Sequence, residues 1–188
     1  MLTGKEIERL VGTGQIVITD FDPKRVNPNS YNLRIGDEIG YYPMNEYHEY
    51  AAADKGKEYP VYYLDSRKEN TLEVLKIPDD GVILTPGLLY LASTMEQVTA
   101  NGVIPCISGR SSIARLGLEI HRTAGFGDIG ADMKWTLEIT VVQPVKIYPR
   151  QELCQIYFEY PDGEFENYKG KYQGSDGIVK SRSFLDRR

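Results

Sequence analysis

The sequence of 188 residues predicts a single, mainly β domain with one short helix near its N-terminus. Short β-branched and apolar runs recur along the chain, and turn-forming residues separate them at the spacing of a β-sandwich or barrel. Tyrosine is abundant, with 14 Tyr against 5 Phe and 1 Trp, and tyrosine favours strands that have a wet edge. We see no internal repeat and no heptad.

The composition narrows the class of protein. Hydrophobic residues make up 41% and charged residues 26%, which is typical of a soluble globular chain. A net charge of −5 argues against binding a nucleic acid polymer through a broad basic surface. No apolar run approaches the roughly 20 residues of a membrane-spanning helix. The polar start carries no secretory signal, so we expect a reducing, cytoplasmic setting and no membrane partner.

The residues that bind metals or form disulfides are few. Cys106 and Cys154 have no CxxC or CxxH spacing, and His48 and His121 add no recognisable metal-ligand set. We therefore expect neither a disulfide framework nor a zinc site. For His121, a structural role in the core is the simpler interpretation.

The first element is a predicted helix. Thr3 and Glu6 stand at capping-box spacing, in which the threonine accepts a hydrogen bond from the first turn and the glutamate reaches back. The apolar face and the end of this helix are Ile7, Leu10, Val11 and then Gly12 or Gly14.

Strands follow, each a short apolar or alternating run. A break at Asp22-Pro23 and a turn at 27–30 separate the first two strands. Residues 43–58 fit a surface excursion between strands, such as a long hairpin, and residues from 161 onward have little to bury. We expect strands at 16–18, 31–35, 61–64, 72–77, 82–84, 88–92, 103–107, 135–142, 145–148 and 153–160.

The densest polar cluster is Ser-Gly-Arg-Ser-Ser-Ile-Ala-Arg at 108–115. Backbone N–H groups, serine hydroxyls and the start of a following short helix suit phosphate oxygens, and arginine grips them. A capped turn with two ordinary surface arginines explains the same residues. A Walker loop is excluded, because no Gly-Lys-Ser/Thr follows.

A second cluster, at 123–130, holds three glycines in six residues, which permits close approach of a ligand to the backbone. Asp128 lies among them, where its carboxylate suits a sugar hydroxyl or a water. Taken alone, the pattern favours a glycine-rich hairpin loop with aspartate as a turn former.

Glu138 stands in a strongly apolar predicted strand, where an unpaired carboxylate is costly to bury. Alternation places Trp135, Leu137 and Ile139 on one face, and Glu138 on the other with Thr136 and Thr140. Glu138 is therefore either on a solvated face or a functional carboxylate. The tail offers Tyr168, Lys171, Tyr172 and Gln173, which fit either a lid over an anionic, stackable ligand or a disordered end.

Together these motifs resemble the dCTP deaminases, and the resemblance covers nearly the whole chain, least at about 43–70. The N-terminal part contributes Ile-Val-Ile-Thr-Asp-Phe-Asp-Pro at 16–23 and Asn-Pro-Asn-Ser-Tyr-Asn-Leu-Arg-Ile-Gly at 27–36. The remaining motifs are 108–118, Thr-Ala-Gly-Phe at 123–126 with Asp128 and Gly130, Thr-Leu-Glu at 136–138, and Lys-Tyr-Gln-Gly at 171–174.

The resemblance implies a fold and an assembly. The fold is a dUTPase-like distorted β-barrel or jelly roll of the β-clip type, with the short N-terminal helix and few others. The assembly is a homotrimer with sites between subunits, and residues from about 161 to 188 serve as a lid-like tail on the single domain. The family deaminates the cytosine of dCTP without zinc, which agrees with the missing His/Cys set.

The resemblance also implies residue roles. Glu138 is the general acid/base that activates a water for attack at C4 and passes protons to the leaving ammonia. Ser111 and Arg115 support the water and the base. The backbone of Ala124 contacts the reacting base or the water, and Asp128 binds the deoxyribose. The implied nucleotide-binding residues are Arg110, Ser111, Ser112, Arg115, Asp128, Thr136, Leu137, Glu138, Gln155, Tyr168, Lys171 and Gln173. Mg²⁺ is expected to arrive on the triphosphate.

One branch of the family releases dUTP, and another also cleaves the α–β phosphate bond to give dUMP and pyrophosphate. Thr-Ala-Gly-Phe at 123–126 and the closing 171–174 and 181–184 motifs favour the dUMP-forming branch, in which Asp128 also orients water for attack on phosphate. Ala131 and Met133 depart from the family, which usually has an aromatic residue and a glycine there, and Ser175 stands where glutamine is common.

Other functions stay open at this point. The chain could be a deaminase that stops at dUTP, or a dUTPase-like hydrolase, although the retained Glu138 argues against the latter. A protein that binds a nucleotide without turnover is the alternative from another class. The expected partners are dCTP or dUTP as substrate, dTTP as inhibitor, and other copies of the chain.

Overall fold

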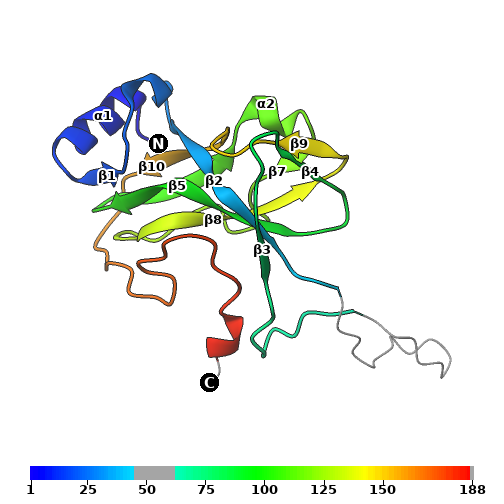
Figure 1. The fold of residues 1–188 in the computed structure, drawn as a ribbon. Helices are drawn as coiled ribbons and strands as arrows, with labels where there is room; N and C mark the ends of the chain where they lie inside the picture. Colours follow the sequence, from blue (N-terminus) through cyan, green and yellow to red (C-terminus); the bar gives the residue numbers. More distant parts are fainter. Residues whose placement is uncertain (45–61, 187–188) are drawn as a thin grey trace.

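The computed structural model describes residues 1–44 and 62–186, and its first element is helix α1 (Gly4–Gly12) (Figure 1). Thr3 caps this helix as predicted, because its Oγ1 accepts a hydrogen bond from the N–H of Glu6 at 3.3 Å. The predicted reach-back of Glu6 is replaced by other contacts, since its carboxylate accepts from Arg9 and from the hydroxyl of Tyr160. The apolar face, with Ile7 and Leu10 fully buried, attaches the helix to the core.

The described residues form ten strands, all paired antiparallel. One eight-stranded sheet has the order β6-β10-β2-β5-β8-β7, with β1 added to β5 and β3 added to β2, and β4 pairs with β9 in a separate ribbon. The strands are β1 (Ile16–Ile18), β2 (Tyr31–Tyr41), β3 (Glu73–Lys76), β4 (Val82–Leu84), β5 (Tyr90–Ala100), β6 (Ile104–Gly109), β7 (Leu118–Glu119), β8 (Asp132–Val141), β9 (Val145–Ile147) and β10 (Glu152–Glu159).

The sheet curves because its two longest strands change partners along their length. The first residues of β2 pair with β10, and its last residues pair with β3 and β5. Register shifts between Ile35 and Ile39 in β2, and between Ser93 and Gln97 in β5, bend the strands at these points. The result is the distorted, nearly closed β-barrel that was expected.

The core fills the inside of this curved sheet. It is built mainly from aliphatic residues, and Tyr31 and Phe158 are the largest fully buried side chains. Strand β8 contributes Trp135, Leu137 and Ile139, all buried, while the side chains between them are only half-buried. The predicted alternation of this strand is therefore confirmed, and it separates a core face from a face that can carry chemistry.

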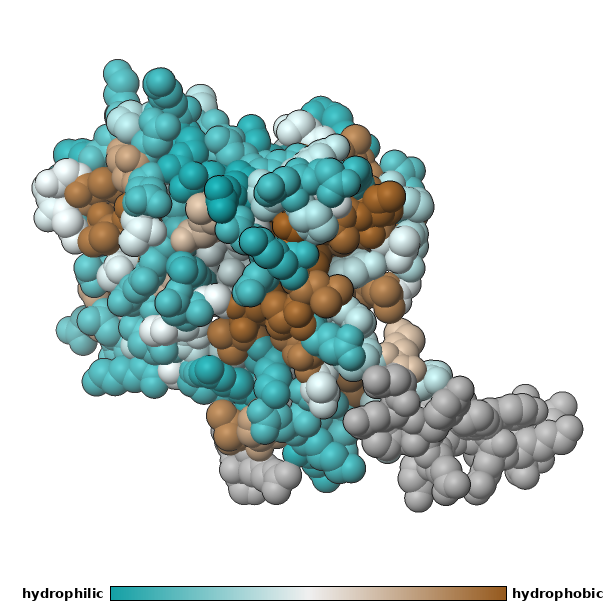
Figure 2. Space-filling model, in the orientation of Figure 1, coloured by the Kyte–Doolittle hydropathy of each residue, from teal (hydrophilic) through white to brown (hydrophobic). Residues whose placement is uncertain are grey.

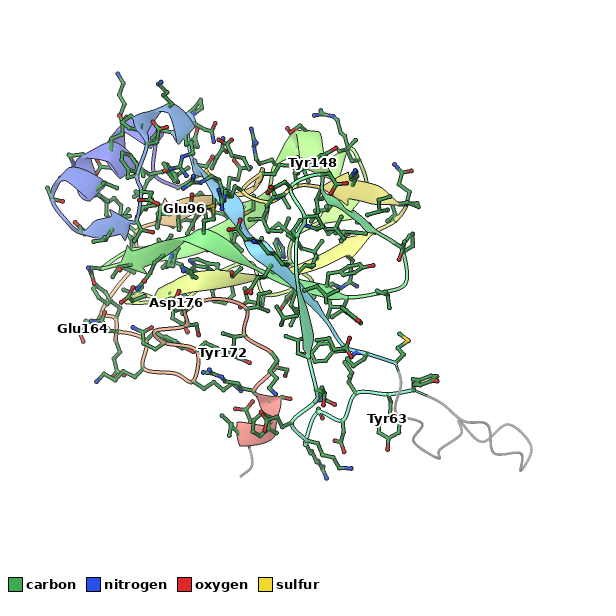
Figure 3. The ribbon with its side chains drawn as sticks, in the orientation of Figure 1. Tyr63, Glu96, Tyr148, Glu164, Tyr172 and Asp176 are labelled. Atoms are coloured by element: carbon green, nitrogen blue, oxygen red, sulfur yellow. The ribbon has the colours of Figure 1, made fainter. Side chains whose placement is uncertain are left out.

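A buried ionic cluster lies between β2 and β5 (Glu96 in Figure 3). The Glu96 carboxylate is fully buried and accepts hydrogen bonds from the backbone N–H of Arg34 at 2.9 Å and from its Nε at 2.7 Å. Arg25 pairs with the same carboxylate and lies over the ring of Tyr31. Arg25 belongs to the short 3-10 helix η1 (Pro23–Arg25), which Asp22 caps, so the cluster ties this turn to the sheet.

Most predicted strands are confirmed, with differences at their ends. Residues 62–64 are not a strand: they are irregular, because the pairing of β2 with β3 begins only at Glu73. Strands β2 and β5 run further than predicted, because their second halves are polar or bulged and lack a clean apolar alternation. Most of the predicted excursion at 43–58 lies outside the described residues.

The remaining elements are short. Helix α2 (Ser111–Ala114) follows β6, as the polar cluster predicted, and the 3-10 helix η2 (Ser183–Leu185) lies near the C-terminus. The segment that leads from β10 to η2, residues 162–182, runs irregularly beneath β8 (Figure 1). Among residues 1–44 and 62–186, no helix is long and apolar enough to span a membrane.

Candidate active site

A cavity of about 360 Å³ lies between β8, the glycine-containing segment before it, and the C-terminal tail. Five of the predicted site residues line it together: Ala124, Asp128, Thr136, Glu138 and Tyr168. They come from three separate parts of the chain, which the fold brings to one place. The other lining residues are mostly apolar or aromatic, which suits a flat, partly apolar ligand.

Glu138 reaches this cavity from the face of β8 that points away from the core. Its Oε2 accepts a hydrogen bond from the backbone N–H of Arg122 at 3.0 Å. Its own backbone N–H donates to the carbonyl of Ile120 at 3.0 Å, and Glu138 pairs with Leu91 of β5 on the other side. The carboxylate therefore has a fixed position and orientation at the cavity wall.

The glycine-rich segment is extended at 125–127 and pairs with β6, so the local hairpin that the pattern alone favoured is wrong. The predicted role of Asp128 in a turn is confirmed, because its carbonyl accepts a hydrogen bond from the N–H of Ala131 at 3.1 Å. The N–H of Ile107 donates to the carbonyl of Gly125 at 2.6 Å, and the N–H of Gly127 donates to the carbonyl of Pro105 at 2.7 Å. A Cβ atom on Gly127 would lie 2.3 Å from Cη2 of Trp135, so this position has no room for a side chain. The pairing places Ala124 and Asp128 at opposite ends of the segment, and both are exposed toward the cavity.

The ring of His121 packs against the same segment. A Cβ atom on Gly125 would lie 3.1 Å from its Cε1 and Nε2 atoms. This contact fits the structural role expected for His121, which does not line the cavity with Glu138.

The C-terminal tail closes the cavity from below. It follows β8 with backbone hydrogen bonds, from the N–H of Gly174 to the carbonyl of Asp132 at 2.9 Å and from the N–H of Lys134 to the carbonyl of Ser175 at 2.8 Å. Figure 3 shows Tyr172 and Asp176 on this segment, beneath β8. Asp176 forms an ion pair with Lys134 at 2.5 Å. In the described residues the tail is thus docked on the barrel.

Further contacts fix the end of the tail. The N–H of Val179 donates to Oγ1 of Thr136 at 3.2 Å, and the N–H of Ser181 donates to the hydroxyl of Tyr42 at 3.1 Å. Lys180 pairs with Glu69 at 2.8 Å. The Thr136 hydroxyl therefore accepts a hydrogen bond from the tail, and this bond links β8 to the lid-like segment.

The predicted phosphate cluster lies elsewhere. Arg110, Ser111, Ser112 and Arg115 surround helix α2, and none of them lines the cavity. In Figure 1, α2 lies at the top of the molecule and the tail at the bottom. Ser111, Ser112 and Arg115 are exposed to solvent, so within one copy of the chain the two halves of the predicted site are separated.

Two of the predicted nucleotide-binding residues near α2, Arg110 and Gln155, form hydrogen bonds within the chain. Arg110 forms an ion pair with Glu152 at 3.1 Å and donates to its carbonyl. Gln155 accepts from the hydroxyl of Ser30 at 2.6 Å and donates to the carbonyl of Gly109 at 2.9 Å. Gln155 therefore holds the start of the polar cluster against β10 in this conformation.

The remaining predicted residues occupy different environments. Leu137 is fully buried in the core, so only its backbone can meet a ligand. Lys171 is paired with Asp186. The Gln173 side chain donates to the carbonyl of Gly130 at 2.9 Å and accepts from the N–H of Asp132 at 3.2 Å, which makes it part of the docking of the tail.

The structure adds cavity residues that were not among the predicted site residues, chiefly Tyr42, Met133, Lys134, Trp135, Val179 and Lys180. Tyr42 could not be found from spacing, because it directly follows β2, far from Glu138 in the sequence. Trp135 carried a usable signal, since it lies three residues from Glu138 on the same predicted strand, and Lys134 directly precedes that strand.

The two cysteines have no role in this site. Both are buried and free, and burial raises the pKa of the Cys106 and Cys154 thiols. A raised pKa disfavours the reactive thiolate. Among the described residues, no group of three or more His, Cys, Asp or Glu side chains is arranged to hold a metal ion.

Comparisons with known proteins agree with this fold and indicate the family. The family model described as dCTP deaminase-like matches residues 1–160. The protein "dCTP deaminase, dUMP-forming" of Clostridium beijerinckii is 44% identical over 187 residues, covering 99% of this chain and 98% of that protein. The protein of the same name from Clostridium botulinum (strain Eklund 17B / Type B) is 46% identical over equal shares of the two chains.

A solved structure supports the fold. The crystal structure of 2'-deoxycytidine 5'-triphosphate deaminase from Agrobacterium tumefaciens aligns with a TM-score of 0.59 at 20% identity. The alignment covers 84% of this chain and 46% of that one. With a matching family model over most of its length and full-length relatives above 40% identity, the chain belongs to the dCTP deaminase-like family.

Proposed function

We propose that the protein is a dUMP-forming dCTP deaminase, which converts dCTP and two waters into dUMP, ammonia and pyrophosphate. Full-length similarity to proteins of that name carries the proposal, and the position of Glu138 at the wall of the cavity beside the C-terminal tail supports it. The product is the nucleotide from which dTMP is made.

In the first step, Glu138 acts as general acid/base. Its carboxylate takes a proton from a water that attacks C4 of the cytosine ring, and it passes protons to the amino group, which leaves as ammonia. The hydrogen bond from the N–H of Arg122 orients the carboxylate before the water arrives. We assign to the backbone of Ala124 a contact with the reacting base, and the position of Ala124 in the lining of the same cavity supports this assignment.

In the second step, a second water attacks the α-phosphorus and pyrophosphate leaves. Asp128 is proposed to bind the deoxyribose and to orient this water, because its carboxylate is exposed at the end of the same cavity. The triphosphate is taken with its Mg²⁺, which belongs to the substrate. Tyr168, Lys171 and Gln173 of the tail would contact the nucleotide once it is bound.

The proposal requires more than one copy of the chain. Ser111 and Arg115 are assigned to the reaction but do not line the cavity with Glu138, so a neighbouring copy would supply them. The expected assembly is a homotrimer. Exposed apolar side chains support assembly, among them Val74 and Leu75 in β3 and Ile83 in β4, and Figure 2 shows apolar areas over these strands.

The docked tail supports a lid over the bound nucleotide. We propose residues from about 161 to 188 as this lid, on a single catalytic domain. Its closure would exclude water other than the two that react. A nucleotide pool enzyme of this kind is proposed to be cytoplasmic and to be inhibited by dTTP, the triphosphate of its downstream product.

A substitution at the general acid/base tests the reaction. Glu138→Gln should abolish ammonia release from dCTP, because an amide cannot exchange the proton, while nucleotide affinity stays within about three-fold of wild type. Trp135 is the single tryptophan and lines the cavity, so its fluorescence reports binding in the same sample. Ammonia release by Glu138→Gln at an undiminished rate would contradict the assignment.

The products formed by the wild-type protein separate the alternatives. Accumulation of dUTP with ammonia from dCTP would indicate a deaminase that stops after the first step. Conversion of dUTP alone, with dCTP inert, would indicate a dUTPase-like hydrolase. Tight binding of nucleotide without any product would indicate a binding protein.

A further inference from the structure

Two exposed side chains and the half-buried Thr140, all beside Glu138, form a closed hydrogen-bonded network. Nη1 of Arg122 lies 3.1 Å from Oε2 of Glu119 and donates to Oγ1 of Thr140 at 3.2 Å. The Thr140 hydroxyl in turn donates to Oε2 of Glu119 at 3.0 Å. Each member contacts both others, so the network has one preferred geometry.

The network connects the turn after β7 to strand β8. Glu119 ends β7 and pairs with Thr140, and Arg122 lies three residues further along the turn. Thr140 is two residues from Glu138 on β8, and their side chains lie on the same face. The backbone N–H of Arg122 is the group that donates to the Glu138 carboxylate.

We propose that Arg122 is a positioning residue for deamination. Its guanidinium clamps the turn to β8 through Glu119 and Thr140, and the clamp keeps the backbone N–H of Arg122 on the Glu138 carboxylate. The inference rests on the proposed role of Glu138 as general acid/base. It assigns Arg122 no contact with the substrate.

The exposure of the clamp separates this role from a purely structural one. The Arg122 and Glu119 side chains are 57% and 59% exposed, and exposed ion pairs contribute little to folding stability. Displacement of a catalytic group by about 1 Å, in contrast, costs a reaction up to about a hundred-fold in rate. The clamp should therefore affect catalysis much more than stability.

Other ionisable groups also surround the Glu138 carboxylate, and the test must account for them. The groups that line the cavity with it are Asp128, Lys134, Lys180, Tyr42, Tyr168 and Tyr172, and the adjacent turn adds His121 and Glu119. Substitutions in the clamp leave all cavity groups in place, so a lower kcat with an unchanged KM would be traced to the position of the Glu138 carboxylate.

The test measures ammonia release from dCTP by two single variants and their double variant. Arg122→Met and Thr140→Val should each lower kcat about ten-fold, with KM within about two-fold of wild type. The double variant should be no worse than the poorer single variant, since both break one network. Arg122→Lys should recover part of kcat.

Arg9→Met is the matched control, because Arg9 pairs with a glutamate three residues earlier on an exposed helix far from the cavity. This control should keep wild-type kcat. Unchanged kcat in both clamp variants would overturn the inference, as would a rise in KM alone, which would make Arg122 a substrate contact. If wild type releases ammonia but Glu138→Gln does so equally, the proposed role of Glu138 fails instead, and if wild type releases no ammonia from dCTP, the proposed function fails.

Discussion

At the scale of single residues, Gly127 and Trp135 are packed so closely that each restricts the other. The Trp135 ring leaves no room for a Cβ at position 127, and Gly127 directly precedes Asp128. The backbone at Gly127 needs no unusual dihedral angle, so glycine is required there by contact and not by conformation. This contact fixes where the Asp128 carboxylate enters the cavity.

Gly127→Ala tests this contact. The added methyl group must displace either the segment or the ring, which should cost about 1–3 kcal/mol of stability. It should also lower dUMP formation about ten-fold or more, because Asp128 moves. Urea unfolding and a product assay measure the two effects.

Gly12→Ala is the control for this substitution, because a Cβ at Gly12 would meet no atom within 4 Å. Equal activity of Gly127→Ala and wild type would show that the contact does not position Asp128.

Sequence reasoning at this scale found the chemistry-bearing residues but not their partners. Glu138 was recognisable as a carboxylate in an apolar strand. Its donor, the backbone N–H of Arg122, could not be predicted, because almost any residue type can donate such a backbone hydrogen bond. Tyr42 was missed for a similar reason, since only the fold brings it to the cavity.

At the scale of elements, β8 serves the core and the cavity through its alternation. Such a strand is predictable, because period-two patterning survives wherever one face is buried. The second half of β5 was not predictable, because its buried residues include Thr94, which accepts a hydrogen bond from the N–H of Trp135 in β8, and Glu96, which accepts from the N–H of Arg34 in β2. The docking of the tail could not be predicted from the sequence either, since it depends on backbone groups and a few polar side chains.

Helix α1 gives the element-scale prediction. Hydrogen bonds from Arg9 and from Tyr160 lower the pKa of Glu6 from its ordinary value of 4.5 to about 2. A lowered folded-state pKa means that the contribution of Glu6 to stability is present above pH 4.5 and is lost as the pH falls toward 2. The stability advantage of wild type over Glu6→Gln should therefore shrink across this range.

Urea midpoints of both proteins between pH 6 and about 3 measure the effect. Glu8→Gln, a substitution on the same helix, is measured in parallel. A difference between wild type and Glu6→Gln that stays constant with pH would contradict the role of the Glu6 carboxylate.

At the scale of the whole molecule, the predicted site is divided between two places. Glu138 and Asp128 line the cavity, whereas Ser111 and Arg115 lie around α2. The motifs predicted both halves, and the resemblance implied sites between subunits. That the halves lie apart within one copy of the chain is seen only in the structure.

Mixing two inactive variants tests the sharing of the site. Glu138→Gln and Arg115→Ala should each be inactive alone. Mixed trimers prepared by co-expression should recover about one quarter of wild-type activity, because one site in four then combines two intact halves. No recovery in mixed trimers that form normally would show that each copy carries a complete site.

The most direct measurement of the central claim is a product time course with the wild-type protein, dCTP and Mg²⁺. Nucleotides are separated by ion exchange while ammonia and pyrophosphate are followed in the same reaction. The account predicts dUMP, ammonia and pyrophosphate in equal amounts from the earliest time points. Ammonia with dUTP and no pyrophosphate, or no product at all from dCTP, would contradict it.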